Sequence, residues 1–196
     1  LLVYPQLPAA TVAELVALGQ RRAEPLRCGV PGLGSVQHLA ARQFERLSGL
    51  RMTHASYASQ PQVLTDLIGG HLDVAIEFPS AALPLVLAGR LRALAVLGPA
   101  RKPALPQLPT AAEQGYADID AGGWISLMAP AGTPPARIAR LNAALHAAMA
   151  EPAFADWVRA NGSELLPSSP EACARHVERE LARWARLVAA AGVRLE

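Results

Sequence analysis

Short apolar runs alternate with amphipathic segments over the first hundred residues, and this alternation predicts strands that are each followed by one helix. The apolar runs lie at residues 1–4, 26–30, 52–57, 72–76 and 91–97. Between these runs, apolar residues recur three and four positions apart, as in a helix that buries one face. Strands joined by single helices pair in parallel through right-handed crossovers, so the pattern predicts an α/β fold.

Capping residues and glycines predict where the helices begin and end. Thr11 and Glu14 have the spacing of a capping box, and Ser35 is placed to cap the next helix, which leads up to Gly49. The helices expected in this part of the chain cover residues 11–22, 35–49 and 61–68, and a further helix ends near Gly89.

The pattern changes towards the C-terminus. A proline-rich connector at residues 98–109 leads to a second capping box at Thr110 and Glu113, and a last strand is expected at residues 125–128. Only helices are expected after it, with prolines in their first turns at Pro134, Pro152 and Pro170. The last helix carries an apolar stripe that predicts core packing, formed by Cys173, Val177, Leu181, Trp184 and Val188.

The composition is that of a globular protein with a large core. The 196 residues are 52% hydrophobic and carry a net charge of only +2, and the basic residues are scattered arginines with a single lysine, Lys102. This distribution argues against nucleic-acid binding, which needs clustered basic residues. No apolar run approaches the roughly 18 residues of a membrane span. Cys28 and Cys173 lack metal-ligand or Cys-x-x-Cys spacing and are interpreted as two buried thiols, although pairing in an oxidising compartment stays open.

A glycine turn between a strand and a helix is the most specific local feature. In Gly32-Leu33-Gly34-Ser35, glycine lets the backbone approach a ligand, and a helix that begins at Ser35 directs N–H groups and the positive end of its dipole above the strand. The turn is therefore a candidate anion site. Tight packing between strand and helix explains the same residues equally well, so both interpretations stay open.

A nucleophile built from Ser35 and His38 is disfavoured. Ser35 does not lie in a Gly-x-Ser-x-Gly elbow, and no acid is placed to orient His38, so we expect His38 to hydrogen-bond locally instead. The other histidines lack metal-ligand spacing, and no metal or other cofactor is expected.

Two further segments are candidates for ligand contact. Tyr57-Ala58-Ser59-Gln60 follows a strand and precedes a helix, and a helix cap at Ser59 or Gln60 explains the segment as well as ligand contact does. Glu77 follows the run at residues 72–76 and is expected at the carboxyl edge of the sheet, where open α/β sheets bind ligands. There it accepts a hydrogen bond from a ligand amine or hydroxyl, or is simply solvated. Asp66 and Asp73 are interpreted as surface and turn residues.

Five ordered motifs give the chain a family resemblance that runs from Leu1 to Glu196. They are Gly32-x-Gly34-Ser35-x-x-His38-Leu39-Ala40, Thr65-Asp66-Leu67-Ile68-Gly69-Gly70-x-x-Asp73-Val74, Gly89-Arg90-Leu91-Arg92-Ala93-Leu94-Ala95-Val96, Leu108-Pro109-Thr110-x-x-Glu113-x-Gly115 and Ala129-Pro130-Ala131-Gly132-Thr133-Pro134. Together they closely resemble the tripartite tricarboxylate transporter receptor family, also called the Bordetella uptake gene, or Bug, family.

The resemblance implies a periplasmic solute-binding protein with the two-lobe, Venus-flytrap fold of type II periplasmic binding proteins. It implies that the chain captures a small carboxylate, such as a di- or tricarboxylate, an acidic amino acid or an aromatic carboxylate, for the membrane permease of a tripartite transporter. The carboxylate would face Gly34, Ser35 and Val36, with His38 supporting the turn that begins at Gly32. Residues 57–60 would form the neighbouring wall.

The chain departs from the family pattern at three places. It reads Tyr57-Ala58-Ser59 where Tyr-Lys-Gly is common, and Glu77 where an aspartate is common. It also lacks roughly the N-terminal third of the family's length, so we expect one complete α/β lobe and a truncated, helix-rich part of the other. Residues 21–121 would be the complete second lobe, and residues 1–20 and 122–196 the remainder of the first.

Several functions are compatible with these observations. The resemblance favours a receptor rather than an enzyme. An effector-sensing domain of a transcriptional regulator has the same architecture, and a fragment that no longer binds ligand is a further alternative. An incomplete lobe would expose apolar surface, so we also expect a homodimer or a trimmed fragment.

Overall fold

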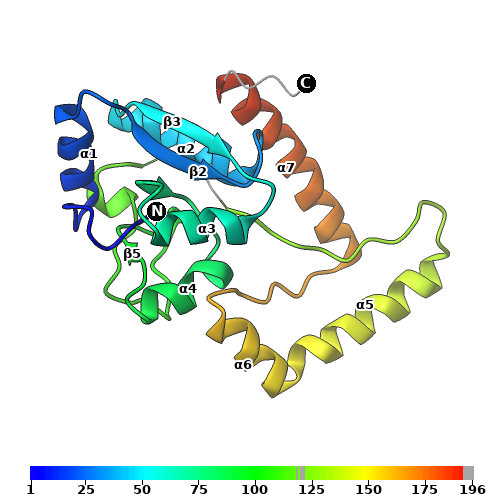
Figure 1. Cartoon of the computed structure of the whole chain (residues 1–196). Helices are drawn as coiled ribbons and strands as arrows, with labels where there is room; N and C mark the ends of the chain where they lie inside the picture. Colours follow the sequence, from blue (N-terminus) through cyan, green and yellow to red (C-terminus); the bar gives the residue numbers. More distant parts are fainter. Residues whose placement is uncertain (118, 120–121, 192–196) are drawn as a thin grey trace. The chain divides into compact units, whose positions relative to one another are not determined.

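The computed structural model describes residues 1–117, 119 and 122–191, which form two compact units. The first unit contains Leu1–Gly123, and the second contains Trp124–Ala190. The sheet and its surrounding helices belong to the first unit, and the long helices near the C-terminus belong to the second (Figure 1). Among the described residues, no helix combines the length and the apolar character that crossing a membrane needs.

The first unit is built on one five-stranded sheet. Its strands lie in the order β3-β2-β4-β1-β5. They are β1 (Leu2–Val3), β2 (Leu26–Val30), β3 (Met52–Ser56), β4 (Val74–Ala75) and β5 (Arg92–Ala93). β2 pairs in parallel with β3 and β4, as predicted, and the fold is α/β.

β1 corrects the expectation of parallel pairing, because it runs antiparallel to both β4 and β5. The reason lies in the chain between β1 and the next helix. Leu7 donates its N–H to the carbonyl oxygen of Tyr4 at 3.1 Å, and Ala9 donates to Leu7 at 2.7 Å. These consecutive turns redirect the chain before the helix begins, so β1 is not joined to β2 by a simple crossover.

Four α-helices and one 3-10 helix accompany the sheet, close to the predicted positions. They are α1 (Val12–Arg21), α2 (Val36–Ser48), α3 (Gln60–Ile68), α4 (Pro79–Leu87) and η1 (Ala112–Gln114). The predicted capping box at the start of α1 is formed, since Thr11 Oγ1 accepts from the N–H of Glu14 at 3.1 Å. The second box is reciprocal, because Thr110 and Glu113 each accept the other's N–H.

The helices cover both faces of the sheet, and the core is divided between these faces. Successive strand residues point to opposite sides, so Val74 joins one buried cluster and Ala75 the other. The first cluster includes Leu15 of α1 and Phe44 of α2, and the second includes Leu67 of α3. Phe44 is fully buried, which stabilises the fold by about 1.5–3 kcal/mol for this side chain.

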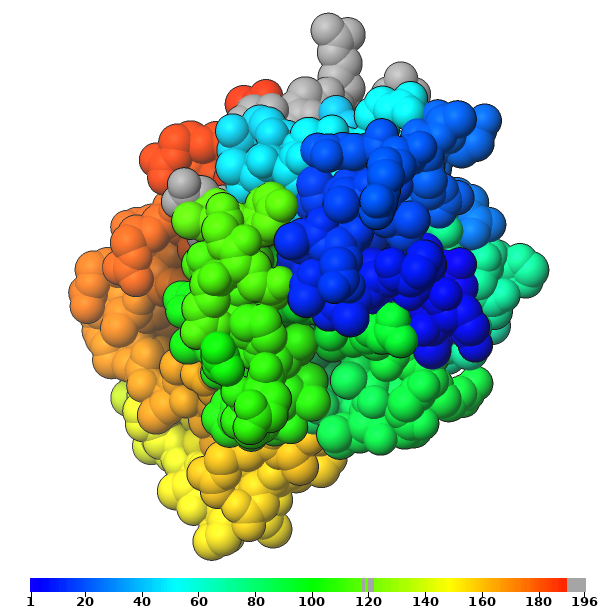
Figure 2. All heavy atoms as spheres, turned by 90° about the vertical axis from the view of Figure 1, so that its left-hand side faces the viewer, coloured from blue at the N-terminus to red at the C-terminus, as the bar shows by residue number. Residues whose placement is uncertain are grey.

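The N-terminal residues lie against β5 and the chain that follows it. Arg92 donates to the carbonyl oxygens of Leu7 and Ala9, both at 3.0 Å, and the side chain of Gln114 accepts from the N–H of Val12 at 3.1 Å. Figure 2 shows these N-terminal residues in blue beside the green segment. The contacts bring the two ends of the first unit's sequence together.

The first twenty residues pack with the sheet. We expected residues 1–20 to form one lobe with residues 122–196, and this lobe assignment stays a prediction; within this chain, β1 lies inside the sheet and α1 contributes to the core beside β2. Residues 1–20 therefore belong to the first unit. The physical reason is that β1 supplies hydrogen-bond partners to the facing edges of β4 and β5, which a buried backbone requires.

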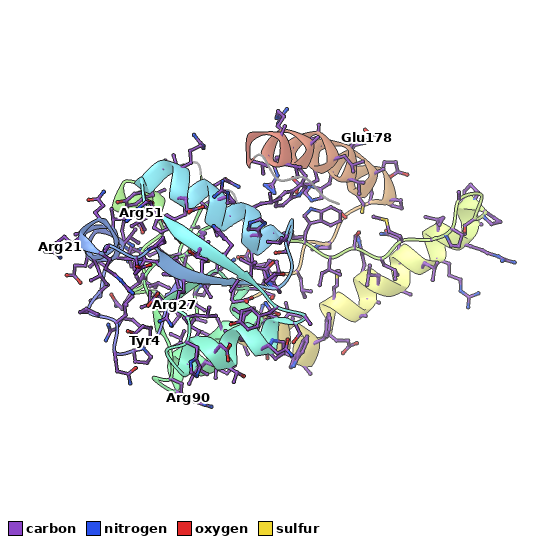
Figure 3. All side chains as sticks on the ribbon, turned by 45° about the horizontal axis from the view of Figure 1, so that its top comes forward. Tyr4, Arg21, Arg27, Arg51, Arg90 and Glu178 are labelled. Carbon is purple, nitrogen blue, oxygen red and sulfur yellow. The ribbon has the colours of Figure 1, made fainter. Side chains whose placement is uncertain are left out.

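Asp73 is a buried ion-pair partner rather than the turn residue expected from sequence. Its side chain is only 1% exposed and pairs with Arg27 at 3.0 Å and Arg22 at 3.2 Å. It also accepts from the backbone N–H of Arg27 at 2.8 Å. Arg27, labelled in Figure 3, further donates to the carbonyl oxygen of Gly70. Asp73 thus fastens the chain before β4 to the start of β2.

The second unit is helical, with α5 (Pro135–Ala150), α6 (Pro152–Ala160) and α7 (Pro170–Ala191). Trp124 and Trp184 both donate their indole N–H to Glu180 Oε2 at 3.1 Å, which ties the start of the unit to α7. The chain leading into α7 is held against α5 by Ser168, whose carbonyl oxygen accepts from the side chain of Asn142 at 2.9 Å.

Two predictions for the second unit were wrong. The strand expected at residues 125–128 is not formed, because none of the described residues offers it a hydrogen-bonded neighbour. Ile125 is fully exposed there. The apolar stripe of α7 is not a buried core either, since Leu181 is 67% exposed. Cys173 is half-buried rather than buried, whereas Cys28 is buried as expected, and both are free thiols.

Candidate functional site

The glycine turn after β2 has the backbone that its sequence predicts. Gly32 has φ of 96° and Gly34 has φ of 82°, in the region that glycine adopts without a steric penalty. Ser35 then caps α2, because its Oγ accepts from the N–H of His38 at 3.2 Å. In return, His38 Nδ1 accepts from the N–H of Gly34 at 2.9 Å. Ser35 and His38 therefore hold the turn from both sides.

This arrangement leaves two backbone donors at the start of α2. Among the described residues, the N–H groups of Val36 and Gln37 have no hydrogen-bond acceptor, whereas the N–H of Leu39 already bonds to Ser35. Unpaired N–H groups at a helix N-terminus, together with the helix dipole, favour an anion. The turn can thus bind a carboxylate through backbone groups.

His38 is held as a neutral acceptor. Burial lowers its pKa, and the neighbouring His54 and Arg42 lower it further, while Glu45 acts in the opposite direction. The rings of His38 and His54 meet edge to face, with centroids 4.9 Å apart. His54 in turn contacts Glu45 Oε2 at 2.8 Å. The neutral ring matters because only an unprotonated Nδ1 can accept from Gly34.

Glu77 connects the first turns of α2 and α3. It directly follows the buried strand region of β4, and its Oε2 accepts from the side-chain amides of Gln60 and Gln37, the latter at 3.4 Å. Its other oxygen, Oε1, is buried and has no hydrogen-bond partner among the described residues. Burial raises the pKa of this carboxyl, although the amides of Gln60 and Gln37 and the backbone N–H of Phe78 offset part of the effect. Glu77 therefore lies at the carboxyl edge of the sheet, as predicted.

Tyr57 and Ser59 contribute less directly than expected. The hydroxyl of Tyr57 donates to Asp66 Oδ2 at 2.7 Å, and burial together with this bond raises its pKa to about 12. Its polar end is thus committed to α3, and Asp66 is a hydrogen-bond partner rather than a simple surface residue. Ser59 occupies the cap position of α3 but makes no side-chain cap bond. Of this segment, only Gln60 reaches another predicted site residue, Glu77.

Gln37 is the site residue that the sequence reasoning missed. Its position offered a signal, because the second residue of a helix that starts at the sheet edge projects towards the neighbouring strand ends. The predicted residues brought together are Gly34, Ser35, Val36 and His38 on the turn, while Gln37 links them to Glu77 and Gln60.

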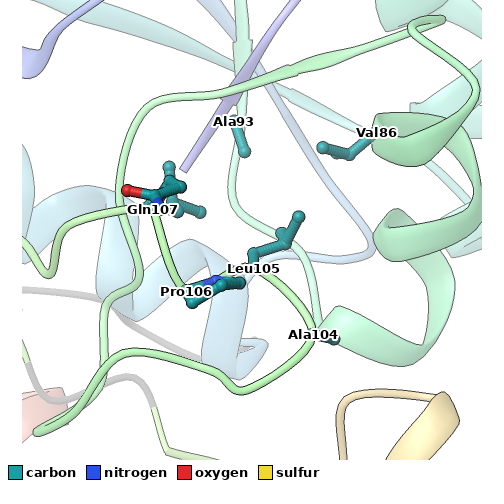
Figure 4. Close-up of a pocket in the computed structure, with 7 residues that line it drawn as sticks. Val86, Ala93, Ala104, Leu105, Pro106 and Gln107 are labelled. Carbon is teal, nitrogen blue, oxygen red and sulfur yellow. The ribbon is translucent and has the colours of Figure 1, made fainter.

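A cavity of about 320 Å³ lies elsewhere in the first unit. It is lined by Val86, Ala93 and residues 104–108 (Figure 4). None of the predicted site residues lines it, and it contains no charged side chain. It is not suited to a carboxylate. Within the described ranges, no group of three or more His, Cys, Asp or Glu side chains is arranged to hold a metal ion.

Comparison with known proteins gives a consistent result. The family model described as tripartite tricarboxylate transporter family receptor matches residues 1–193. Protein BugT of Bordetella pertussis is 31% identical over 196 residues, which are 100% of this chain and 60% of that protein. The chain thus spans about three fifths of the length of this curated relative.

Solved structures show the same architecture. Rpa4515 of R. palustris, solved with adipate, has a TM-score of 0.90 and 34% sequence identity, and the match covers 97% of this chain and 64% of that one. The periplasmic binding protein BugD also has a TM-score of 0.90, with 27% identity over 100% of this chain and 66% of BugD. The fold is therefore that of periplasmic binding proteins.

Proposed function

Because the chain belongs to the tripartite tricarboxylate transporter receptor family, we propose that it is the ligand-capturing part of an extracytoplasmic receptor for a small carboxylate. The observation that carries this proposal is the pair of unpaired backbone N–H groups, on Val36 and Gln37, beside a glycine turn at a helix N-terminus. Hydrolysis through Ser35 and His38 is not proposed, since both side chains are committed to holding the turn.

The energies agree with this role. A hydrogen bond to a charged group contributes about 1.5–3 kcal/mol, and a helix terminus adds up to about 2 kcal/mol in a partly buried site. Two amides and one helix end therefore contribute about 3–8 kcal/mol. Micromolar affinity requires about 8 kcal/mol, so further donors, such as the first turn of α3, complete the site without a cationic side chain.

The setting of the receptor is part of the proposal. The periplasm is its compartment, and the membrane subunits of a tripartite transporter are its partners; the family description and the periplasmic relative BugD support both. We further propose that the first unit, Leu1–Gly123, is the ligand-binding lobe and that the second, Trp124–Ala190, belongs to the other lobe. The cap at Ser35 and the glycine turn both lie in the first unit.

A ligand screen tests the proposal. The chain is titrated with C4 to C6 dicarboxylates, citrate, acidic amino acids and aromatic carboxylates, because a ligand that binds only the native state raises the unfolding midpoint. Amide NMR at millimolar ligand detects weak binding, and Val36 and Gln37 are the signals expected to move. If no carboxylate moves either signal or the midpoint, the proposal is wrong.

Ser35→Ala distinguishes a receptor from an enzyme. Loss of the cap costs about 1 kcal/mol of stability, and a receptor should lose only part of its affinity because the backbone donors remain. Ser169→Ala is the matched control, since Ser169 makes the same kind of cap bond, to the N–H of Ala172 at 3.2 Å, in the second unit. Turnover of an ester or amide substrate that disappears in Ser35→Ala alone would indicate a hydrolase.

A further inference from the structure

We propose that Glu77 makes the site specific for carboxylates that also carry a hydrogen-bond donor, either a hydroxyl or an ammonium group. This inference rests on the proposed function, because it concerns the second half of the same site. It assigns a chemical class to the ligand that a carboxylate-binding turn alone does not.

Glu77 lies beside the proposed carboxylate site. Gln37, which reaches Glu77 Oε2 at 3.4 Å, is also one of the two residues whose backbone N–H is free for the carboxylate. Gln60, at the first position of α3, donates to the same oxygen. A ligand held at the turn therefore lies next to the residue that orients Glu77.

The Oε1 atom of Glu77 lacks a hydrogen-bond donor within the described part of the chain. Both amides use Oε2, so Oε1 is left buried without a donor among the described residues. A buried, unpaired acceptor is unfavourable, and more so when it is charged. Among the described residues, no cationic side chain forms an ion pair with Glu77 that would fill this need.

The ligand is thus the source of the missing donor. A hydroxyl or ammonium group satisfies Oε1, whereas a plain dicarboxylate brings only acceptors and sets like charges against each other. The carboxylate of Glu77 consequently attracts one class of ligand and repels the other, which is how a site discriminates between compounds of the same size.

Glu77→Gln tests the role of this oxygen with little change in shape. The side-chain amides of Gln37 and Gln60 still require an acceptor, so the new carbonyl oxygen takes the place of Oε2 and the new NH₂ group faces the ligand. The substitution therefore turns the ligand-facing acceptor into a donor. The preference for ligands with a donor should be lost or reversed.

The experiment compares succinate, malate and aspartate, which share a four-carbon dicarboxylate skeleton and differ by a hydrogen, a hydroxyl and an ammonium group. Dissociation constants are measured on the full chain by amide NMR and calorimetry. We expect malate or aspartate to bind at least about tenfold tighter than succinate, equivalent to about 1.4 kcal/mol. In Glu77→Gln this ratio should fall to one or below, whereas the exposed Glu24→Gln control should keep it.

The outcomes separate the two proposals. Binding of succinate as tight as that of malate and aspartate would overturn the role of Glu77 and leave the carboxylate receptor standing. An unchanged ratio in a folded Glu77→Gln protein would do the same. No response to any carboxylate would overturn the proposed function itself. The near-ultraviolet circular dichroism of each variant checks that the fold is kept.

Discussion

Gly34 donates its backbone N–H to His38 Nδ1 at 2.9 Å, so the first turn of α2 closes back on the glycine turn that precedes it. Ser35 caps the same helix turn, because its Oγ accepts from the N–H of His38 at 3.2 Å. The shape of the candidate anion site therefore depends on the protonation of one histidine ring. This dependence leads to the first prediction.

Acidification should weaken the fold through His38. Its folded pKa is lowered below 6.5, mainly by burial, so the unfolded state binds the proton more readily. The stabilisation is then complete above the unfolded pKa and is lost as the pH falls from about 6.5 through the folded pKa. Urea unfolding from pH 8 to 5 should show this fall, and it should be smaller in His38→Gln. Replacing the exposed His71 by Gln should leave the slope unchanged.

Asp73→Asn should cost about 1–3 kcal/mol of unfolding free energy at neutral pH. Burial raises the pKa of Asp73, but the hydrogen bonds and charges of Arg27 and Arg22 outweigh it and hold the pKa below 3.8. The stabilisation is therefore present above about pH 3.8 and is lost as the pH falls below it towards the lowered folded pKa. Urea unfolding at pH 7 and pH 3 measures both effects.

The control for Asp73 is Asp156→Asn. Asp156 pairs with Arg159, but the two side chains are 72% and 69% exposed. An exposed pair of this kind contributes at most about 1 kcal/mol. Equal losses at the two positions would contradict a special role for the buried carboxylate.

Gly32→Ala should reduce carboxylate affinity as well as stability. A Cβ at Gly32 meets no atom within 4 Å, but φ of 96° is strained for alanine, at a cost of about 1–2 kcal/mol. Gly49→Ala is matched to it, with φ of 68° and open space at the end of α2. Calorimetry should show several-fold weaker binding in Gly32→Ala only. Equal affinities in the two variants would contradict a role of the glycine turn in ligand binding.

Gly29→Ala tests the packing of β2 on α3. A Cβ at Gly29 would lie 2.3 Å from Leu72 Cδ1 and 2.9 Å from Val63 Cγ1, so we expect a loss of about 1–3 kcal/mol. Leu72→Val shortens the first of these side chains and should recover part of the loss in the double variant. Thermal unfolding of the four proteins gives the coupling energy, and strictly additive losses would contradict the clash.

Self-association is expected at high concentration. Ile125, Leu127 and Trp157 of the second unit are exposed by 101%, 64% and 62%, and exposed apolar side chains favour association. Light scattering should give a mass above that of one chain, falling in the Ile125→Ser and Trp157→Ser double variant. A single-chain mass at every concentration would contradict this prediction.

Local signals predicted the first unit well because they act over a few residues. The capping box at Thr11 and the cap at Ser35 were confirmed, since each requires only a side chain and an N–H three positions later. The glycine turn followed from the same local chemistry. Strand lengths were less predictable: the run at residues 72–76 forms only the two-residue β4.

Strand, ion-pair and hydrogen-bond partners that lie far apart in the chain could not be predicted from the sequence. An apolar run such as residues 125–128 becomes a strand only if another strand pairs with it. None of the described residues forms such a partner strand. Asp73 was interpreted as a turn residue because its partners, Arg27 and Arg22, lie 46 and 51 positions away in the sequence. The link from Gln37 to Glu77 joins residues forty positions apart, beyond any spacing rule.

The place of β1 in the sheet has a consequence for the order in which the chain folds as it is synthesised. β2, β3 and β4 can pair once Ala75 has left the ribosome, but Leu2 needs both Ala75 and Ala93 as partners. β1 therefore precedes its partners along the chain but is among the last strands to be locked into the sheet. Such distant pairing slows folding, and it makes completion of β5 the event that commits the unit to its native topology.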